Sequence, residues 1–318
     1  MGGIETLMDA TFTLGIASAL FGMAMSYTPL HAETDIPQKV ILDTDIGDDI
    51  DDAYALALLA TMPEANLLGV TTVYGETDKR AELAAKLLKI LRRTDIPVYA
   101  GRTGLSHIGR QYEWAKGFKS SAIRRSDAIE FMKREIERAP GEVILIGIGP
   151  LINYGDLLTR FPEIRPLIKR IVIMGGSVYK GYDNQDAIAA EWNVRCDPAA
   201  AMSVISSGVP LTVVPLDATS MLKFDEERQK RLCTLGLPIT DALAALTKLW
   251  GNPIPTLYDP MAVAAALGYS FCESKEINLE VDEEGYSRVG CDEPNVTVLL
   301  NPNVDQFLDW FIQAIRSE

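Results

Sequence analysis

One stretch of the chain, residues 40 to 59, reads VILDTDIGDDIDDAYALALL and joins an apolar run to a helix-forming segment through a cluster of aspartates. Six carboxylates fall within ten positions, and no Lys or Arg lies in the stretch; they are Asp43, Asp45, Asp48, Asp49, Asp51 and Asp52. Clustered like charges repel and raise each other's pKa, so the fold has to compensate them. A helix N-terminus stabilises one or two carboxylates, whereas a hard cation can hold several.

The apolar run before the aspartates is the first in an alternating series of strands and helices. Near-continuous Val, Ile and Leu runs are typical of buried strands in a parallel sheet. We expect strands at residues 39–45, 66–75, 96–101, 142–149, 170–176 and 210–217, with a late pair at 273–281 and 295–301. We expect helices at residues 51–62, 77–93, 126–139, 155–168 (broken), 197–208, 225–235 and 239–250. The pattern predicts an α/β fold over residues 38–318, a single doubly wound, mostly parallel sheet with helices on both faces.

Ligands of doubly wound sheets bind at the carboxyl ends of the strands. The aspartate cluster follows the first expected strand, and Tyr74-Gly75-Glu76, Gly149-Pro150-Leu151-Ile152-Asn153 and Met174-Gly175-Gly176 follow others. We therefore expect these loops to converge on one rim. One aspartate is enough to cap the helix, so the remaining carboxylates favour an oxygen-preferring cation such as Ca²⁺.

Composition limits the class of partner. The chain has 318 residues, 47% of them hydrophobic, with a formal net charge of −14 and a pI near 4.7. This acidity argues against nucleic-acid and anionic-membrane binding and favours a neutral or cationic small molecule. None of the four cysteines forms a CxxC pair, so buried free thiols are expected, with a Cys272–Cys291 bridge left open.

Residues 1–32 are typical of a secretory signal peptide. The run ATFTLGIASALFGMAMSYTPLHA, residues 10–32, is apolar, rich in small residues and ends in Ala32. The segment before it contains Glu5 and Asp9 and no Lys or Arg, which leaves a misassigned start codon or an uncleaved anchor open. We predict a periplasmic or secreted mature protein, with a cytoplasmic one as the alternative. The mature form is not expected to span a membrane, because no later segment is apolar for long enough.

The chain resembles the inosine-uridine-preferring nucleoside hydrolases. Their signature, Asp-x-Asp-x-Gly and then Asp-Asp-Ala opening a helix, is present as Asp43-Thr44-Asp45-Ile46-Gly47 and Asp51-Asp52-Ala53, with two extra residues between the halves. Similar anchors follow in order at Val70–Gly75, Gly149–Asn153, Met174–Gly176, Ala190–Asn193, Asp197-Pro198 and Tyr258–Pro260. The resemblance covers residues 38 to 318.

The resemblance implies cleavage of the N-glycosidic bond of ribonucleosides with a bound Ca²⁺. Residue by residue, it assigns the metal to Asp45, Asp52, Asp259 and the backbone carbonyl of Ile152, where the family usually has Thr. It also assigns Asp45 as the group that takes a proton from the attacking water. Metal binding lowers the pKa of that water.

Seven residues are assigned to the substrate on the same basis. Asp51 is expected to bind a ribose hydroxyl, with Asp49 as the alternative because of the insertion. Glu191 and Asn193 are expected to hold the sugar, and Trp192 to stack on the base. Three departures from the family matter: Glu76 stands where Asn often faces the sugar, and Tyr258 where many members carry His. The third is Asp183-Asn184-Gln185-Asp186, which replaces the region of a further ribose-binding Asn, so that contact is not assigned. The Tyr258 side chain either packs against its neighbours in the fold or protonates the leaving base.

Other readings of the residues stay open. Haloacid-dehalogenase phosphatases also begin with Asp-x-Asp, but Gly47 stands where they need Thr or Val. A second alternative is a non-catalytic exported protein that binds nucleosides or sugars. Such a protein would not need Asp45 as a base, so the presence of Asp45 argues against it. A hydrolase of another riboside on the same fold is suggested by Glu76 and Tyr258. A homodimer or homotetramer is the expected assembly, and Trp114, Trp250 and Trp310 are expected to pack between helices.

Overall fold

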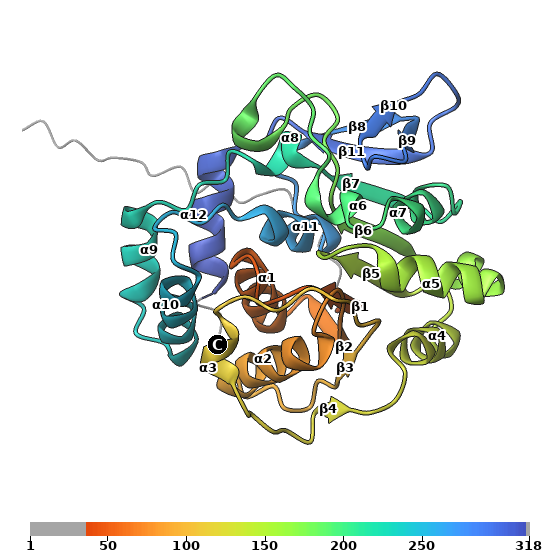
Figure 1. Ribbon diagram of the computed structural model, residues 1–318. Helices are drawn as coiled ribbons and strands as arrows, with labels where there is room; N and C mark the ends of the chain where they lie inside the picture. Colours follow the sequence, from red (N-terminus) through yellow and green to blue (C-terminus); the bar gives the residue numbers. More distant parts are fainter. Residues whose placement is uncertain (1–35, 316–318) are drawn as a thin grey trace, which may run out of the picture.

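The buried apolar runs form the central sheet of a computed structural model, which describes residues 36–315 (Figure 1). Nine strands lie in the order β4-β3-β2-β1-β5-β6-β7-β11-β8. All neighbours in this sheet are parallel except β11 and β8, so the predicted mostly parallel sheet is confirmed. The strands are β1 (Gln38–Thr44), β2 (Ala65–Thr72), β3 (Val98–Ala100), β4 (Ile123–Arg124), β5 (Val143–Gly147), β6 (Arg170–Met174), β7 (Leu211–Val214), β8 (Glu273–Ile277) and β11 (Val296–Leu300). The predicted signal peptide, residues 1–32, lies outside the described residues.

Helices cover both faces of the sheet, as the alternating pattern predicts (Figure 1). The longer ones are α1 (Asp51–Thr61), α2 (Thr77–Ile90), α4 (Ala128–Arg138), α5 (Ile152–Arg160), α7 (Pro198–Ile205), α9 (Glu226–Cys233), α10 (Pro238–Trp250), α11 (Tyr258–Ala266) and α12 (Val304–Ala314). Single turns are α3 (Tyr112–Ala115), α6 (Trp192–Arg195) and α8 (Leu216–Thr219), with 3₁₀ segments η1 (Pro162–Leu167) and η2 (Tyr182–Asn184). No helix among residues 36–315 is long and apolar enough to span a bilayer.

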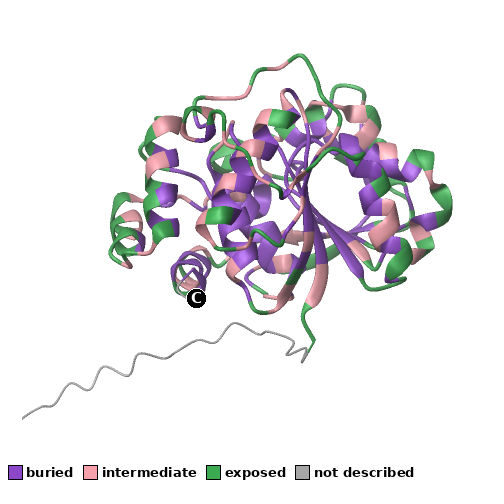
Figure 2. Ribbon diagram, turned by 90° about the horizontal axis from the view of Figure 1, so that it is seen from below, coloured by how far each residue is buried: buried purple, intermediate pink, exposed green. Residues whose placement is uncertain are grey.

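Two hydrophobic cores lie on opposite faces of the sheet. Successive side chains of a strand point to opposite faces. In β1, Val40 and Leu42 therefore pack into the core that includes α1, α2, α10, α11 and α12, whereas Ile41 packs into the core of α4, α5 and α7. Buried residues are concentrated on the strands and on the helix faces turned toward them (Figure 2). A strand buried on both faces explains the uninterrupted Val, Ile and Leu runs of the sequence.

The C-terminal third differs from the sequence prediction. The expected strand at 273–281 is two strands in different sheets: β8 pairs with β11, and β9 (Leu279–Val281) pairs with β10 (Ser287–Val289). The expected strand at 210–217 ends at Val214, and α8 begins at Leu216. Helices α11 and α12 were not predicted, although α11 carries Asp259.

Candidate active site

A cavity of about 330 Å³ opens at the carboxyl ends of the central strands. It lies where the winding of the sheet reverses, because β1 is followed by β2 on one side and lies beside β5 on the other. Among residues 36–315, seven carboxylates line the cavity, and none of its lining residues is Lys, Arg or His. The lining residues are Asp45, Asp48, Asp49, Asp51, Asp52, Ile148, Met174, Tyr182, Glu191, Trp192, Asn193, Trp250, Tyr258 and Asp259.

Three of these carboxylates form a compact group. One oxygen from each of Asp51, Asp52 and Asp259 lies within 4.8 Å of the others, and all three residues are buried. Asp51 and Asp52 begin α1, and Asp259 lies in the first turn of α11, which packs against α1. The backbone N–H of Asp259 donates to Asp51 Oδ2 at 3.1 Å, and the Thr44 hydroxyl donates to Asp52. Asp45 lines the same cavity but lies outside this compact group.

The electrostatics of the group fit a hard divalent cation. Burial, followed by repulsion from neighbouring carboxylates, raises the pKa of Asp51, Asp52 and Asp259 well above the ordinary value. Burial also raises the pKa of Asp45 to about 7, against the opposing charge of Arg80. A cation bound among these oxygens stabilises the ionised forms. An all-oxygen donor set is the one that Ca²⁺ and Mg²⁺ prefer.

Glu191 and Asn193 hold the opposite wall of the cavity together. The Glu191 carboxylate caps α6 by accepting from the N–H groups of Asn193 at 3.0 Å and Val194 at 3.3 Å, and also accepts from Gly176 N at 2.9 Å. The Asn193 amide donates to the carbonyls of Met174 at 3.1 Å and Ile148 at 3.3 Å. Both side chains are therefore fixed by the backbone at the ends of β5 and β6. Their remaining lone pairs are the acceptors available to a ligand.

Aromatic residues form the outer part of the cavity. Tyr182 and Tyr258 meet edge to face with ring centroids 6.5 Å apart, and Trp192 meets Tyr74 in the same way at 5.9 Å. Trp192 is 40% exposed, so its ring is accessible at the mouth. Burial raises the pKa of Tyr182 and Tyr258 above the ordinary value, which keeps both hydroxyls protonated. Such a wall suits a flat, uncharged or cationic ring.

Comparison with known proteins identifies the family. A profile of the family described as inosine-uridine preferring nucleoside hydrolase matches residues 40–309. The chain belongs to this family. The pyrimidine-specific ribonucleoside hydrolase RihA of Shewanella sp. (strain MR-7) is 30% identical over 316 residues, covering 87% of this chain and 96% of the relative. RihA of Salmonella arizonae is 28% identical over 309 residues, covering 87% and 98%.

Solved nucleoside hydrolases share the fold. The purine-preferring ribonucleoside hydrolase from Gardnerella vaginalis superposes with a TM-score of 0.77 at 24% identity, covering 88% of this chain and 98% of that one. The inosine-uridine preferring nucleoside hydrolase from Bacillus anthracis superposes with a TM-score of 0.75 at 20% identity, covering 88% and 100%. The predicted family and fold are therefore confirmed, and the chain is an N-glycosidase of the nucleoside hydrolase family.

Nine of the sequence-predicted site residues line the cavity of this nucleoside hydrolase, and two do not. The nine are Asp45, Asp49, Asp51, Asp52, Glu191, Trp192, Asn193, Tyr258 and Asp259. Glu76 is not among the lining residues. Its carboxylate accepts from the Ile108 N–H at 3.1 Å and from Lys79, and it lies 3.4 Å from His107 Nδ1. Ile152 is the buried first residue of α5 and is also absent from the lining.

Several lining residues were not assigned to the site from the sequence. Trp250, expected only to pack, ends α10 at the cavity, and Tyr182 comes from η2 in the loop after β6. Ile148 and Met174 lie at the ends of β5 and β6. Met174 was expected at the rim with Gly175 and Gly176, although no role was assigned to it. Ile148 could have been found in the same way, because the end of its strand is recognisable from the apolar run. Tyr182 and Trp250 approach the site only through tertiary packing, for which the sequence gives no local signal.

Proposed function

We propose that the protein hydrolyses the N-glycosidic bond of ribonucleosides with the help of a bound calcium ion, releasing ribose and the free base. The observation that carries the proposal is the buried group of Asp51, Asp52 and Asp259, with Asp45 on the wall of the same cavity. The similarity to ribonucleoside hydrolases supports the substrate class. The described lining carries seven carboxylates and no Lys, Arg or His, which disfavours a phosphorylated substrate because a phosphate would face like charges.

Calcium is proposed to be held by Asp52 and Asp259, with Asp45 and the Ile152 carbonyl as the further ligands implied by the family motif. A bound calcium ion supplies positive charge that offsets the carboxylates, orients hydroxyl groups and makes a nearby water more acidic. Asp51 also belongs to the compact carboxylate group, and we propose that it accepts a hydrogen bond from a ribose hydroxyl. Asp49 is the alternative for this contact, since it too lines the cavity.

The sugar and the base are proposed to occupy different parts of the cavity. Glu191 and Asn193, fixed by the backbone, accept hydrogen bonds from the remaining ribose hydroxyls. Trp192 and Tyr258 contact the base at the aromatic mouth. Asp45 takes a proton from the attacking water while the bond to the base lengthens, and the departing base takes up a proton, for which Tyr258 is the candidate donor. The sugar then develops oxocarbenium character, which the surrounding carboxylates stabilise.

Two experiments test the proposal. Release of reducing sugar from common ribonucleosides is measured for the metal-stripped protein with and without added calcium, and we expect activity only with calcium. Asp45→Asn keeps the shape of the side chain but removes the base, so kcat should fall by ~10² to 10⁴-fold with a smaller change in KM. Asp95→Asn is the matched control, because the Asp95 side chain is 65% exposed and, within the part of the chain that the structure describes, forms an ion pair with Arg93 alone.

The outcomes separate an enzyme from a binder. Full kcat in Asp45→Asn would remove Asp45 from the proton transfer. Binding of nucleosides without release of sugar from any of them would support the non-catalytic alternative. Hydrolysis that is unchanged by a chelator would overturn the role of calcium while leaving the glycosidase activity in place.

A further inference from the structure

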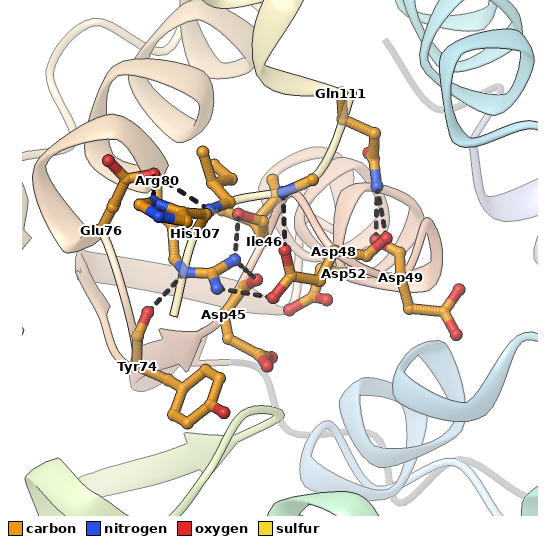
Figure 3. A network of polar contacts seen from close by, with 12 residues as sticks. Asp45, Ile46, Asp48, Asp49, Asp52, Tyr74, Glu76, Arg80, His107 and Gln111 are labelled. Carbon is orange, nitrogen blue, oxygen red and sulfur yellow. Dashed lines mark hydrogen bonds and ion pairs between the residues drawn. The ribbon is translucent and has the colours of Figure 1, made fainter. Parts of the chain in front are cut away.

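Arg80 is a fully buried charged residue next to the active site that the proposed reaction does not use. It lies in the first part of α2 and does not line the cavity. All three guanidinium nitrogens have partners (Figure 3). Nε donates to the Tyr74 carbonyl at 2.7 Å, Nη1 to the carbonyls of Ile46 at 3.1 Å and of Asp45, and Nη2 to Asp48 Oδ2 at 2.6 Å.

These contacts connect two loops that follow neighbouring strands. Asp45, Ile46 and Asp48 belong to the turn between β1 and α1, and Tyr74 belongs to the turn between β2 and α2. Tyr74 has a positive φ of 66°, so its backbone is held in a conformation that non-glycine residues rarely adopt. A planar guanidinium presents its donors in a fixed fork, and replacing it by a flexible ammonium loses that geometry. The position of the Asp45 carbonyl is therefore set by Arg80.

Asp48, in the segment between the two halves of the motif, extends the connection to a third loop. Its Oδ1 accepts from the Gly109 N–H at 2.8 Å while Oδ2 binds Arg80. Gln111 donates to the carbonyl of Asp49 at 2.7 Å and to that of Asp48 at 3.3 Å (Figure 3). The segment that contains Asp48 and Asp49 is thus held by Arg80 and by residues 109–111. After Ile50, Asp51 and Asp52 begin α1.

We propose that Arg80 is a positioning residue, which together with Asp48 fixes the turn carrying Asp45 in the geometry needed for binding the divalent cation and for catalysis. The inference rests on the proposed function. Arg80 acts through the backbone carbonyls and through Asp48, and it touches neither substrate nor metal. Outer partners of metal ligands typically contribute ~10 to 100-fold to metal affinity or activity.

Calcium affinity distinguishes positioning from a simple charge effect. Removing a positive charge near the carboxylates strengthens calcium binding by Coulomb's law, whereas loosening the turn weakens it. We therefore measure calcium binding to the metal-stripped Arg80→Met and Arg80→Lys proteins by calorimetry, and kcat and KM at saturating calcium. We expect Arg80→Met to bind calcium ~10 to 100-fold more weakly and to lose kcat by a similar factor, with little change in KM. Arg80→Lys should recover only part of the calcium affinity and only part of kcat.

Asp48→Asn and a double variant test the partnership. Asp48→Asn should weaken calcium binding in the same direction, and Arg80→Met with Asp48→Asn should be no worse than Arg80→Met alone, because the two side chains act as one unit. Arg93→Met is the matched control. Arg93 donates to the Ala60 carbonyl at 3.0 Å and pairs with Asp95, at the far end of α1. It should leave calcium affinity and kcat unchanged.

Each outcome decides the proposal. Unchanged or stronger calcium binding in Arg80→Met, with full kcat and only a lower melting temperature, would overturn it and leave a structural role. If Arg80→Met does not fold, Arg80→Lys and Asp48→Asn decide, and normal calcium affinity in both overturns the proposal. A wild-type protein that binds calcium but hydrolyses no ribonucleoside refutes the proposed function alone, since the calcium measurements on the variants still test Arg80.

Discussion

Removing the cation should reverse the pH dependence of stability. In the metal-free protein, burial raises the pKa of Asp43 and of Asp45 to about 7, and burial with mutual repulsion raises the pKa of Asp51, Asp52 and Asp259 as well. In the unfolded chain these groups titrate near the ordinary aspartate value of about 3.9. Between about pH 8 and pH 5 the folded state therefore takes up protons that the unfolded state does not.

The direction and size follow from this difference. Because the folded state binds more protons over this interval, the free energy of unfolding of the metal-free protein rises as the pH falls. One pKa unit corresponds to about 1.4 kcal/mol, so a single group shifted to about 7 contributes roughly 2 to 3 kcal/mol between pH 8 and pH 5. The calcium-loaded protein should show the opposite slope, since protons then compete with the metal for the same oxygens.

Urea denaturation, followed by tryptophan fluorescence at several pH values with a chelator or with calcium, measures both slopes. Asp52→Asn provides an internal check: without a buried charge at this position, the chelated variant should be more stable than the chelated wild type near neutral pH. A chelated wild type whose stability is flat, or falls as the pH is lowered, would refute the reasoning. The carboxylates would then be ionised without any cation.

Two further predictions concern loops around the cavity. Asp217 accepts hydrogen bonds from the backbone N–H groups of residues 178–180, and this loop carries Tyr182. Asp217→Ala should raise KM for a nucleoside more than it lowers kcat and should destabilise the protein by about 1 to 3 kcal/mol, measured by steady-state kinetics and denaturation. Gly47 has a φ of +118°, and an added Cβ would lie 2.5 Å from Ile108 Cδ1. Gly47→Ala should lower the free energy of unfolding by about 1 to 3 kcal/mol.

The sheet and the rim of the site could be predicted because their signals are local. A strand buried on both faces must be apolar throughout, and residues 143–147 and 170–174 are. Parallel strands place their carboxyl ends together, so the aspartates after β1 and the turns after β5 and β6 had to meet. The family motif assigned Asp259 to the same metal as Asp45 and Asp52, more than two hundred residues away. The structure brings Asp259 together with Asp52 and Asp51 and leaves Asp45 on the wall of the same cavity.

Helix α11 was missed because it lacks the polar face that identifies a helix. Its residues Tyr258–Ala266, YDPMAVAAA, are nearly all buried, since the helix packs between α1 and the sheet. A helix that is apolar all round has no 3.6-residue alternation to detect. For residues 273–281 the extended conformation was predicted correctly, but the pairing was not. The segment changes partner at Asn278, and this change depends on which distant strand each half meets.

The burial of Arg80 and its hydrogen-bond partners could not be predicted from the sequence, for a physical reason. In TDKRAELAAKLLKI it lies among charged residues at the start of an amphipathic helix, where a solvated side chain is the usual outcome. A buried guanidinium is stable only when its donors are satisfied, and those of Arg80 are satisfied by Asp45, Ile46, Asp48 and Tyr74, from two other segments. No local pattern contains this information. Glu76, predicted to face the sugar, is held by Ile108 and Lys79 for the same kind of reason.

The placement of Arg80 also bears on which substrates the cavity admits. Its guanidinium donates to backbone carbonyls and to Asp48. Its positive charge therefore offsets the negative charge of the turn between β1 and α1, and it presents no donor to the cavity. The carboxylates on the cavity side are left to a divalent cation and to hydroxyl donors. A ligand rich in hydroxyl groups and free of negative charge satisfies those oxygens, and a phosphate ester does not. Because this buried arginine presents no donor to the cavity, we expect the protein to favour a nucleoside over the corresponding nucleotide, and the ratio of kcat/KM for the two measures this preference.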